Sequence, residues 1–255
     1  MRYTYGTSET AAQRLEEIAK FFNPLAKQFI QGNLKRPVEV AIDLGCGPGF
    51  TTEMLALATN CKNVYGLDSS TDYIAMAKDR FGQLHFVKHD VTQVPFPLLA
   101  DVMYMRFLLS HLNDIGLLLT NWVNELSEDG VLFVEELEDI YTDVDVFKRY
   151  LEVNAGLVSS QGAELFVGRT LVDAVSGLSV ISNESVILPV KDWQAATWFY
   201  PNTISVWEQE QYVLDLLLEA ERKEISEALL DVKMDKSGES NIAWKMRRII
   251  LSKVS

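Results

Sequence analysis

Short apolar runs that predict β-strands alternate with helical patterns through the middle of the chain. The strand candidates are residues 38–44, 63–68, 84–90, 100–107 and 131–137. Helical apolar spacing follows several of them, so that strand and helix succeed each other in a regular rhythm. Each return to the sheet then crosses over through a helix, which makes neighbouring strands parallel. The pattern therefore predicts an α/β fold with a Rossmann-like, doubly wound and mostly parallel sheet.

The segments that flank this core have other patterns. Ahead of it, helical spacing predicts one helix over residues 8–22 and a second, short helix from Pro24 to near Gly32. Behind it, the patterns predict a helical region at residues 139–177 and a β-like run at 178–189. An aromatic-rich helical stretch from 192 to about 230 and a last strand at 242–254 follow.

Composition and charge restrict the class of partner. The net charge of −13 argues against a nucleic-acid backbone or an anionic lipid as the partner. The first ten residues have no apolar core, so no signal peptide is predicted, and no apolar run approaches the length of a membrane span. Two cysteines, Cys46 and Cys61, make neither a disulfide framework nor a zinc site. We expect a reduced, cytoplasmic protein without a metal, as a monomer or homodimer.

Three glycines follow the first predicted strand within the run AIDLGCGPGF, residues 41–50. In an open α/β sheet, ligands bind at the carboxyl ends of the strands, where the strand order reverses. Glycines there permit positive φ angles and let a ligand approach the main chain, and the next helix offers unpaired N–H groups. A purely structural turn needs only one glycine. The set Gly45, Gly47 and Gly49 therefore predicts a ligand site.

The spacing of these glycines indicates which ligands do not fit. Dinucleotide enzymes favour G-x-G-x-x-G, but the third glycine position here is Phe50, and no GK[ST] follows to make a P-loop. Asp43, just before the turn, would repel a pyrophosphate and suits a ligand that presents an ammonium group.

Two further aspartates end the next two predicted strands. Asp68 can accept hydrogen bonds from ribose hydroxyls, and Asp90 can accept one from an adenine amino group, with Val91 beside the ring. Any one of the three aspartates alone would be read as a turn residue on the surface. Together with the glycine turn, they predict a ligand that carries an ammonium group, a ribose and an adenine.

At these residues the chain resembles the class I S-adenosylmethionine-dependent methyltransferases. The segments VAIDLGCGPG, GLDSS and HDVTQVPFP look like their first three motifs, and ADVMYMRFLLSHLND and LSEDGVLFVEE like the segments that follow. A bacterial small-molecule subgroup is similar also at YTYGTSETAAQRL and GAELFVGRTLVDAVSGL. The resemblance covers most of residues 1–180. Residues 190–240 match no pattern of the family, which leaves the substrate open.

The resemblance implies a domain plan and a set of cofactor contacts. It implies a single domain with four parts. These are an N-terminal helical cap (residues 1–36), a cofactor-binding core (37–137), a helical lid insertion (138–177), and C-terminal strands with an aromatic-rich helical insertion (178–255). It implies S-adenosylmethionine as the cofactor and S-adenosylhomocysteine as its product. The implied contacts are Asp43, Gly45, Cys46 and Gly47 for the methionine portion, Asp68 and Ser69 for the ribose, Asp90 and Val91 for the adenine, and the Arg106 backbone carbonyl for the amino group.

Two N-terminal residues are further candidates for cofactor contacts. By the resemblance, Tyr3 closes over the cofactor and Arg14 reaches its carboxylate. For Arg14, a position on a solvated helix face is the alternative.

Methyl transfer is an in-line displacement, so the protein mainly has to align the acceptor and exclude water. His111, just past the fourth strand, is the catalytic candidate, with a packing or orienting histidine as the alternative. Candidates for the substrate pocket are Phe107, Glu135 at the end of the fifth strand, and Trp198 and Tyr200 in the aromatic stretch. The alternative for the aromatic residues is a place in the core.

Three functions remain open at this point. The favoured one is a methyltransferase for a small molecule with an N, O or C acceptor. An RNA or protein methyltransferase is the second, although the acidic charge opposes RNA. A protein that binds the cofactor on the same fold without methyl transfer is the third.

Overall fold

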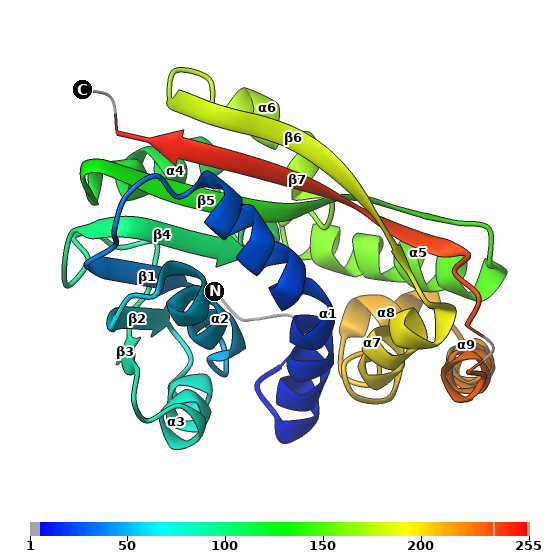
Figure 1. Ribbon diagram of the computed structural model, residues 1–255. Coiled ribbons are helices and arrows are strands. Elements are labelled where there is room, and N and C mark those ends of the chain that lie inside the picture. Colours follow the sequence, from blue (N-terminus) through cyan, green and yellow to red (C-terminus); the bar gives the residue numbers. More distant parts are fainter. Residues whose placement is uncertain (1–5, 237, 254–255) are drawn as a thin grey trace.

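The computed structural model describes residues 6–236 and 238–253, and one twisted sheet runs through it (Figure 1). The strand order is β3-β2-β1-β4-β5-β7-β6. Strand β7 is antiparallel to both of its neighbours, and the remaining pairs are parallel. The predicted Rossmann-like sheet is confirmed. The strands are β1 Val40–Leu44, β2 Asn63–Asp68, β3 His85–Lys88, β4 Ala100–Arg106, β5 Leu126–Thr142, β6 Ser179–Val190 and β7 Ile242–Ser252.

Helices cover both faces of this sheet (Figure 1). The central strands are apolar in their middle residues because successive side chains enter opposite layers of core, and their charged residues lie at or near the strand ends. Ile42 packs with Leu118 and its neighbours in α4, while Ala41 packs with Phe29 of α1 and Leu55 of α2. The helices are α1 Glu9–Asn33, α2 Phe50–Thr59, α3 Thr71–Arg80, α4 Ile115–Asn124, α5 Asp145–Ser160, α6 Leu171–Ala174, α7 Asp192–Ser205, α8 Gln211–Leu216 and α9 Glu219–Met234, with 3-10 turns η1 Leu109–His111 and η2 Val167–Arg169.

The N-terminal region contains one long helix where two were predicted. Pro24 lies inside α1, although proline removes a backbone donor and favours a break. Phe22 and Ala26, on either side of it, are both buried, and so is Ile30 one turn further on. Burial of this continuous apolar face outweighs the local preference of proline, so the prediction of a separate short helix was wrong.

The fifth strand is also longer than predicted. It continues to Thr142 because β7 pairs with it as far as Ile242, so the helical prediction for residues 139–142 was wrong. The extended ends of β5 and β7 shelter a second core with α5, α7 and α9, next to α1 (Figure 1). Most of the aromatic-rich stretch lies in that core; Trp207, for example, is fully buried.

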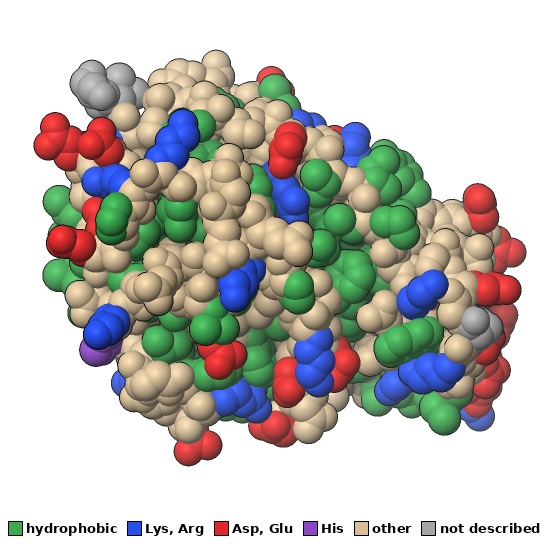
Figure 2. Space-filling model, in the orientation of Figure 1, with side chains coloured by type: hydrophobic (Ala, Val, Ile, Leu, Met, Phe, Trp, Pro, Cys, Tyr) green, Lys and Arg blue, Asp and Glu red, His purple; other side chains and the backbone are tan. Residues whose placement is uncertain are grey.

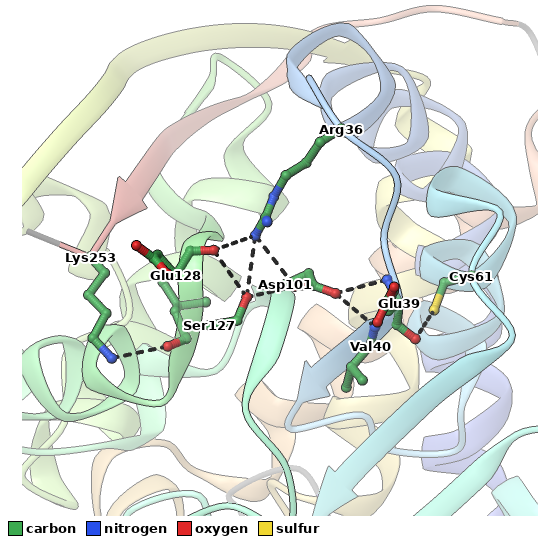
Figure 3. Close-up of polar contacts among 9 residues, drawn as sticks. Arg36, Glu39, Val40, Cys61, Asp101, Ser127, Glu128 and Lys253 are labelled. Atoms are coloured by element: carbon green, nitrogen blue, oxygen red, sulfur yellow. Dashed lines mark hydrogen bonds and ion pairs between the residues drawn. The ribbon is translucent and has the colours of Figure 1, made fainter. Parts of the chain in front are cut away.

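A polar cluster fastens the amino ends of β1, β4 and β5, at the edge opposite their carboxyl ends (Figure 3). Asp101 Oδ2 accepts hydrogen bonds from the backbone N–H groups of Glu39 at 2.8 Å and Val40 at 3.1 Å. Its Oδ1 accepts one from the Ser127 hydroxyl at 2.6 Å. Arg36 donates to the Glu128 carbonyl at 2.9 Å. This cluster sets where β1 starts, and hence where its carboxyl end lies.

We expect Asp101→Ala to lower the free energy of unfolding at pH 7 by about 2–4 kcal/mol, because it leaves two backbone donors without their charged acceptor. Partial burial acts to raise the pKa of Asp101, but the hydrogen bonds from Ser127, Glu39 and Val40 bring the pKa below its ordinary value. The stabilisation is therefore present above the pKa of the unfolded chain and is lost as the pH falls through the folded pKa. Urea unfolding at pH 7 and pH 3.5 measures both effects. Glu128→Ala, next to this cluster with an exposed side chain, is the control and should change little.

Candidate active site

A cavity of about 830 Å³ lies at the carboxyl ends of β1, β2 and β4, where the strand order reverses. Its size is that of a small-molecule or cofactor site. Most of the residues predicted for a ligand meet there. They are Asp43, Gly45, Cys46, Gly47, Asp68, Ser69, Asp90, Val91, Arg106, Phe107 and His111. Tyr3 lies outside the described residues, and Arg14, Glu135, Trp198 and Tyr200 are not among those that line this cavity.

The glycine turn combines positive φ angles with an open approach. Gly45 and Gly47 have φ angles of +68° and +52°, which favour glycine. A Cβ on Gly45 would lie 2.7 Å from Leu108 Cδ1, so this glycine also serves packing. A Cβ on Gly47 would find no neighbour nearer than Leu15 Cδ1, at 3.8 Å. The backbone at Gly47 therefore faces open space, as a bound ligand requires.

Asp68, at the end of β2, holds this turn in place. Its Oδ2 accepts a hydrogen bond from the Gly47 N–H at 2.9 Å, and its Oδ1 accepts one from the Ser70 N–H at 2.7 Å. Burial raises the pKa of Asp68 in spite of these two bonds. Each carboxylate oxygen has a second lone pair, so Asp68 can still accept from a ligand hydroxyl.

Asp43, at the end of β1, is a buried carboxyl group in the wall of the cavity. Its Oδ2 accepts both of its hydrogen bonds, from the hydroxyls of Thr51 at 2.6 Å and Thr52 at 2.7 Å. Burial raises its pKa to about 7, although these bonds and the charge of Arg106 act to lower it. A cationic ligand group beside Asp43 would stabilise the ionised form. Asp43 therefore suits an ammonium group.

Asp90 and Val91, which follow β3, form another part of the cavity wall. Asp90 Oδ1 accepts from the Thr92 hydroxyl at 2.7 Å and from its N–H at 3.0 Å, and these bonds lower the pKa of Asp90. Val91 is buried, and Trp122 Nε1 donates to its carbonyl at 2.8 Å. An apolar ring with one amino group fits this part of the wall. Sequence reasoning did not single out the residues that complete the wall beyond η1. They are Leu112, Asn113 and Asp114, at the end of the segment ADVMYMRFLLSHLND, and Leu117, Leu118 and Asn121, which belong to no motif.

Arg106 presents its side chain as well as its backbone to this region. Its Nη2 donates to Asn23 Oδ1 at 2.8 Å, while its Nη1 is buried without a hydrogen-bond partner among the described residues. The guanidinium carbon lies 5.5 Å from the Phe22 ring centre. Arg106 thereby connects α1 with the end of β4.

A second cavity, of about 110 Å³, adjoins the first and shares four wall residues with it: Leu15, Ile18, Phe107 and His111. Arg14 lines this second cavity instead of the first, and so does Trp198. The Arg14 Nε donates to the Trp198 carbonyl at 2.9 Å. The boundary between the cavities is made by α1, through Leu15 and Ile18, and by the loop that follows β4.

Two predicted pocket residues lie elsewhere. Glu135 is buried; it accepts from the Tyr104 hydroxyl and from Arg248, both at 2.8 Å, and lines neither cavity. The prediction that it faces a substrate was wrong, because an internal ion pair occupies it. Tyr200 also lines neither cavity, and Lys233 lies 5.1 Å from its ring centre.

Glu136, the neighbour of Glu135, supports the boundary loop. Its Oε1 accepts from the N–H groups of Leu108 at 2.7 Å and Leu109 at 2.8 Å. Burial raises its pKa to about 8, against the effect of these bonds. Sequence reasoning singled out Glu135, whereas it is Glu136 that holds the loop.

His111 ends η1 and lines both cavities. Burial, followed by the charge of Arg14, lowers its pKa to about 4. The imidazole is therefore neutral at pH 7 and can donate or accept a hydrogen bond, but it is a weak base.

The core sequence and the fold both define a class. Residues 42–134 match the family model of a methyltransferase domain, Methyltransf_11. Over 99% of this chain and 76% of the other, the fold superposes on coclaurine N-methyltransferase bound to N-methylheliamine and SAH, with a TM-score of 0.56 and 17% identity. A [4+2]-cyclase has the same fold, with a TM-score of 0.54 and 15% identity over 91% of this chain and 81% of the other. Residues 42–134 thus match a methyltransferase domain, and the fold is that of the class I S-adenosylmethionine-dependent methyltransferases.

A curated relative comes nearer in sequence. A trans-aconitate 2-methyltransferase of Methylobacterium radiotolerans is 28% identical over 146 residues, which are 57% of this chain and 56% of the relative. The chain thus matches about half the length of that relative. No helix among the described residues has the length and apolar character needed to cross a membrane.

Proposed function

We propose that the protein transfers a methyl group from S-adenosylmethionine to a small molecule. The observation that carries the proposal is the meeting of Asp43, Asp68 and Asp90 with an open glycine turn in one cavity, beside a second cavity for an acceptor. The name of the trans-aconitate methyltransferase supports a small acceptor, and the family model supports the cofactor.

The residues of the first cavity fit the parts of this cofactor. Asp43 would hold the ammonium group, Asp68 the ribose hydroxyls, and Asp90 with Val91 the adenine. When bound, the cofactor supplies a methyl group on a positively charged sulfur. The turn at Gly47 leaves room for close approach to the backbone. Ser69 and Cys46 would complete the walls around the ribose and the methionine portion.

The chain's own part in the reaction is to orient the acceptor and exclude water. Phe107 and His111 stand where the two cavities meet. His111 is a poor general base, since its pKa of about 4 makes it a weak proton acceptor. We assign it the orientation of the acceptor through a hydrogen bond.

The alternatives have less support. Lys and Arg side chains are scattered among acidic ones on the face shown in Figure 2, and the net charge is −13, which disfavours RNA. The [4+2]-cyclase shows that this fold also occurs in a protein named for another reaction, so a test must detect methyl transfer itself. We also propose that the chain forms a single domain, that the protein is a monomer or homodimer, and that it is cytoplasmic.

Asp68→Ala should weaken the binding of S-adenosylhomocysteine by about 1.5–3 kcal/mol, because it removes a charged hydrogen-bond acceptor. Calorimetry measures this effect. Asp79→Ala, an exposed aspartate on α3, is the matched control and should bind as the wild type does. In the same assay NAD and ATP should not bind. Tight NAD binding, or no S-adenosylhomocysteine binding by the wild type, would contradict the proposed function. Transfer of a labelled methyl group then separates a methyltransferase from a protein that only binds the cofactor.

A further inference from the structure

The wall of the second cavity combines aromatic rings with aliphatic side chains, and several of the rings pack against one another. Tyr150 stacks on Phe199 with ring centres 4.2 Å apart and an angle of 21° between the planes. Trp198 meets Trp244 edge-on at 5.2 Å. Asn202 donates to the Tyr150 hydroxyl at 2.6 Å, which holds that ring in place. Walls of this kind are pre-formed and suit a compact apolar body.

The same cavity has one charged group in its wall. Of the described residues that line it, Arg14 alone carries a full charge at neutral pH, and no Asp, Glu or Lys is among them. The bond from Arg14 to the Trp198 carbonyl holds the guanidinium at the wall. His111, also in the wall, is uncharged because burial and Arg14 lower its pKa to about 4. The cavity therefore favours one negative charge, and Arg14 would repel an ammonium group there.

Size restricts the ligand further. An apolar cavity of about 150 Å³ is sufficient for benzene. The second cavity, at about 110 Å³, is smaller than that, so it holds a short chain, or a single ring only if part of the ligand extends into the adjoining first cavity. A tricarboxylate would place three charges where one guanidinium is present, and the remaining two would be buried without a partner.

We propose that the second cavity binds a small monocarboxylic acid with an aromatic or aliphatic body, its carboxylate directed to Arg14 and its body held among Phe199, Trp198 and Trp244. That the acid is the methyl acceptor rests on the proposed function. A carboxylate is already ionised at pH 7, so an acceptor of this kind needs no general base, in agreement with the weak base at His111. The trans-aconitate methyltransferase differs in this respect, since its named substrate is a tricarboxylic acid.

The test compares four probes by calorimetry on the full chain in the presence of S-adenosylhomocysteine. Benzoate should bind, benzamide should bind about tenfold or more weakly because it lacks the charge, and benzylamine and trans-aconitate should not bind measurably. Arg14→Gln should lower the affinity for benzoate about tenfold and leave benzamide unchanged, whereas Arg14→Lys should retain part of the benzoate affinity. Arg149→Gln is the matched control, because Arg149 forms an exposed ion pair with Glu224.

Each other outcome overturns the inference. Trans-aconitate or benzylamine binding more tightly than benzoate would show a different charge preference, and no benzoate binding at all would remove the acid site. An unchanged benzoate affinity in Arg14→Gln would exclude the guanidinium as the partner. If that variant does not fold, the ratio of benzoate to benzamide on the wild type decides. Failure of S-adenosylhomocysteine to bind would contradict the proposed function only, because benzoate binding can be measured on the protein alone.

Discussion

Glu136→Ala should lower the free energy of unfolding at pH 7 by about 2–6 kcal/mol, since it leaves two buried N–H groups without an acceptor at about 1–3 kcal/mol each. These groups belong to Leu108 and Leu109, in the loop that separates the two cavities. Phe107, just ahead of them, has a φ angle of +55°, a conformation that needs such support. Urea unfolding measures the loss, and it should be accompanied by weaker binding of S-adenosylhomocysteine.

Glu136→Gln separates the hydrogen bonds from the charge. Burial raises the pKa of Glu136 to about 8 from an ordinary value of 4.5, so the group is mostly neutral at pH 7, and glutamine preserves the accepting oxygen. Since the folded pKa is the higher one, the stability that Glu136 contributes is present below pH 4.5 and is lost as the pH rises through 8. The glutamine variant should lack this part of the pH dependence, so it should unfold near the wild-type urea concentration at pH 4 and be more stable than the wild type at pH 7. An equal loss in both variants would contradict this account.

The parts of the site that the sequence predicted are those whose chemistry is local. A glycine turn and aspartates at strand ends meet at one edge because parallel strands end there, and the structure places Asp43, Asp68 and Asp90 in one cavity. Their assignment to parts of a ligand remains a prediction. The helix break at Pro24 failed for the converse reason, because a local preference was outweighed by burial of α1 against distant residues.

The second cavity shows what could not be predicted. Its wall combines Arg14 of α1, Tyr150 of α5, Trp198 of α7 and Trp244 of β7, which no local pattern brings together. Glu135 and Glu136 point to opposite faces of β5, as neighbouring strand residues do, and both are buried. Which carboxylate supports the site therefore depended on tertiary partners, here Arg248 for Glu135.

Asp43→Asn should weaken the binding of S-adenosylhomocysteine at pH 8 by about 3–5 kcal/mol, because it removes one partner of a buried ion pair. The reason is the position of Asp43 in the cavity wall, where burial raises its pKa to about 7. An ammonium group binds the ionised form, so the affinity of the wild type should rise with pH, by up to about tenfold per unit below pH 7, and level off above it. Calorimetry between pH 5.5 and 8 measures the profile, which the asparagine variant should lack.

The control for this prediction is a smaller ligand, 5′-methylthioadenosine, which has the adenine, ribose and sulfur but no amino-acid head group. Its affinity should be nearly the same for wild type and Asp43→Asn and should not follow the pH profile. Asp68 would still hold its ribose, so Asp68→Ala should weaken both ligands, and the two aspartates can be told apart. If Asp43→Asn weakens both ligands equally, then Asp43 only supports the turn through Thr51 and Thr52, and the ammonium group is bound elsewhere.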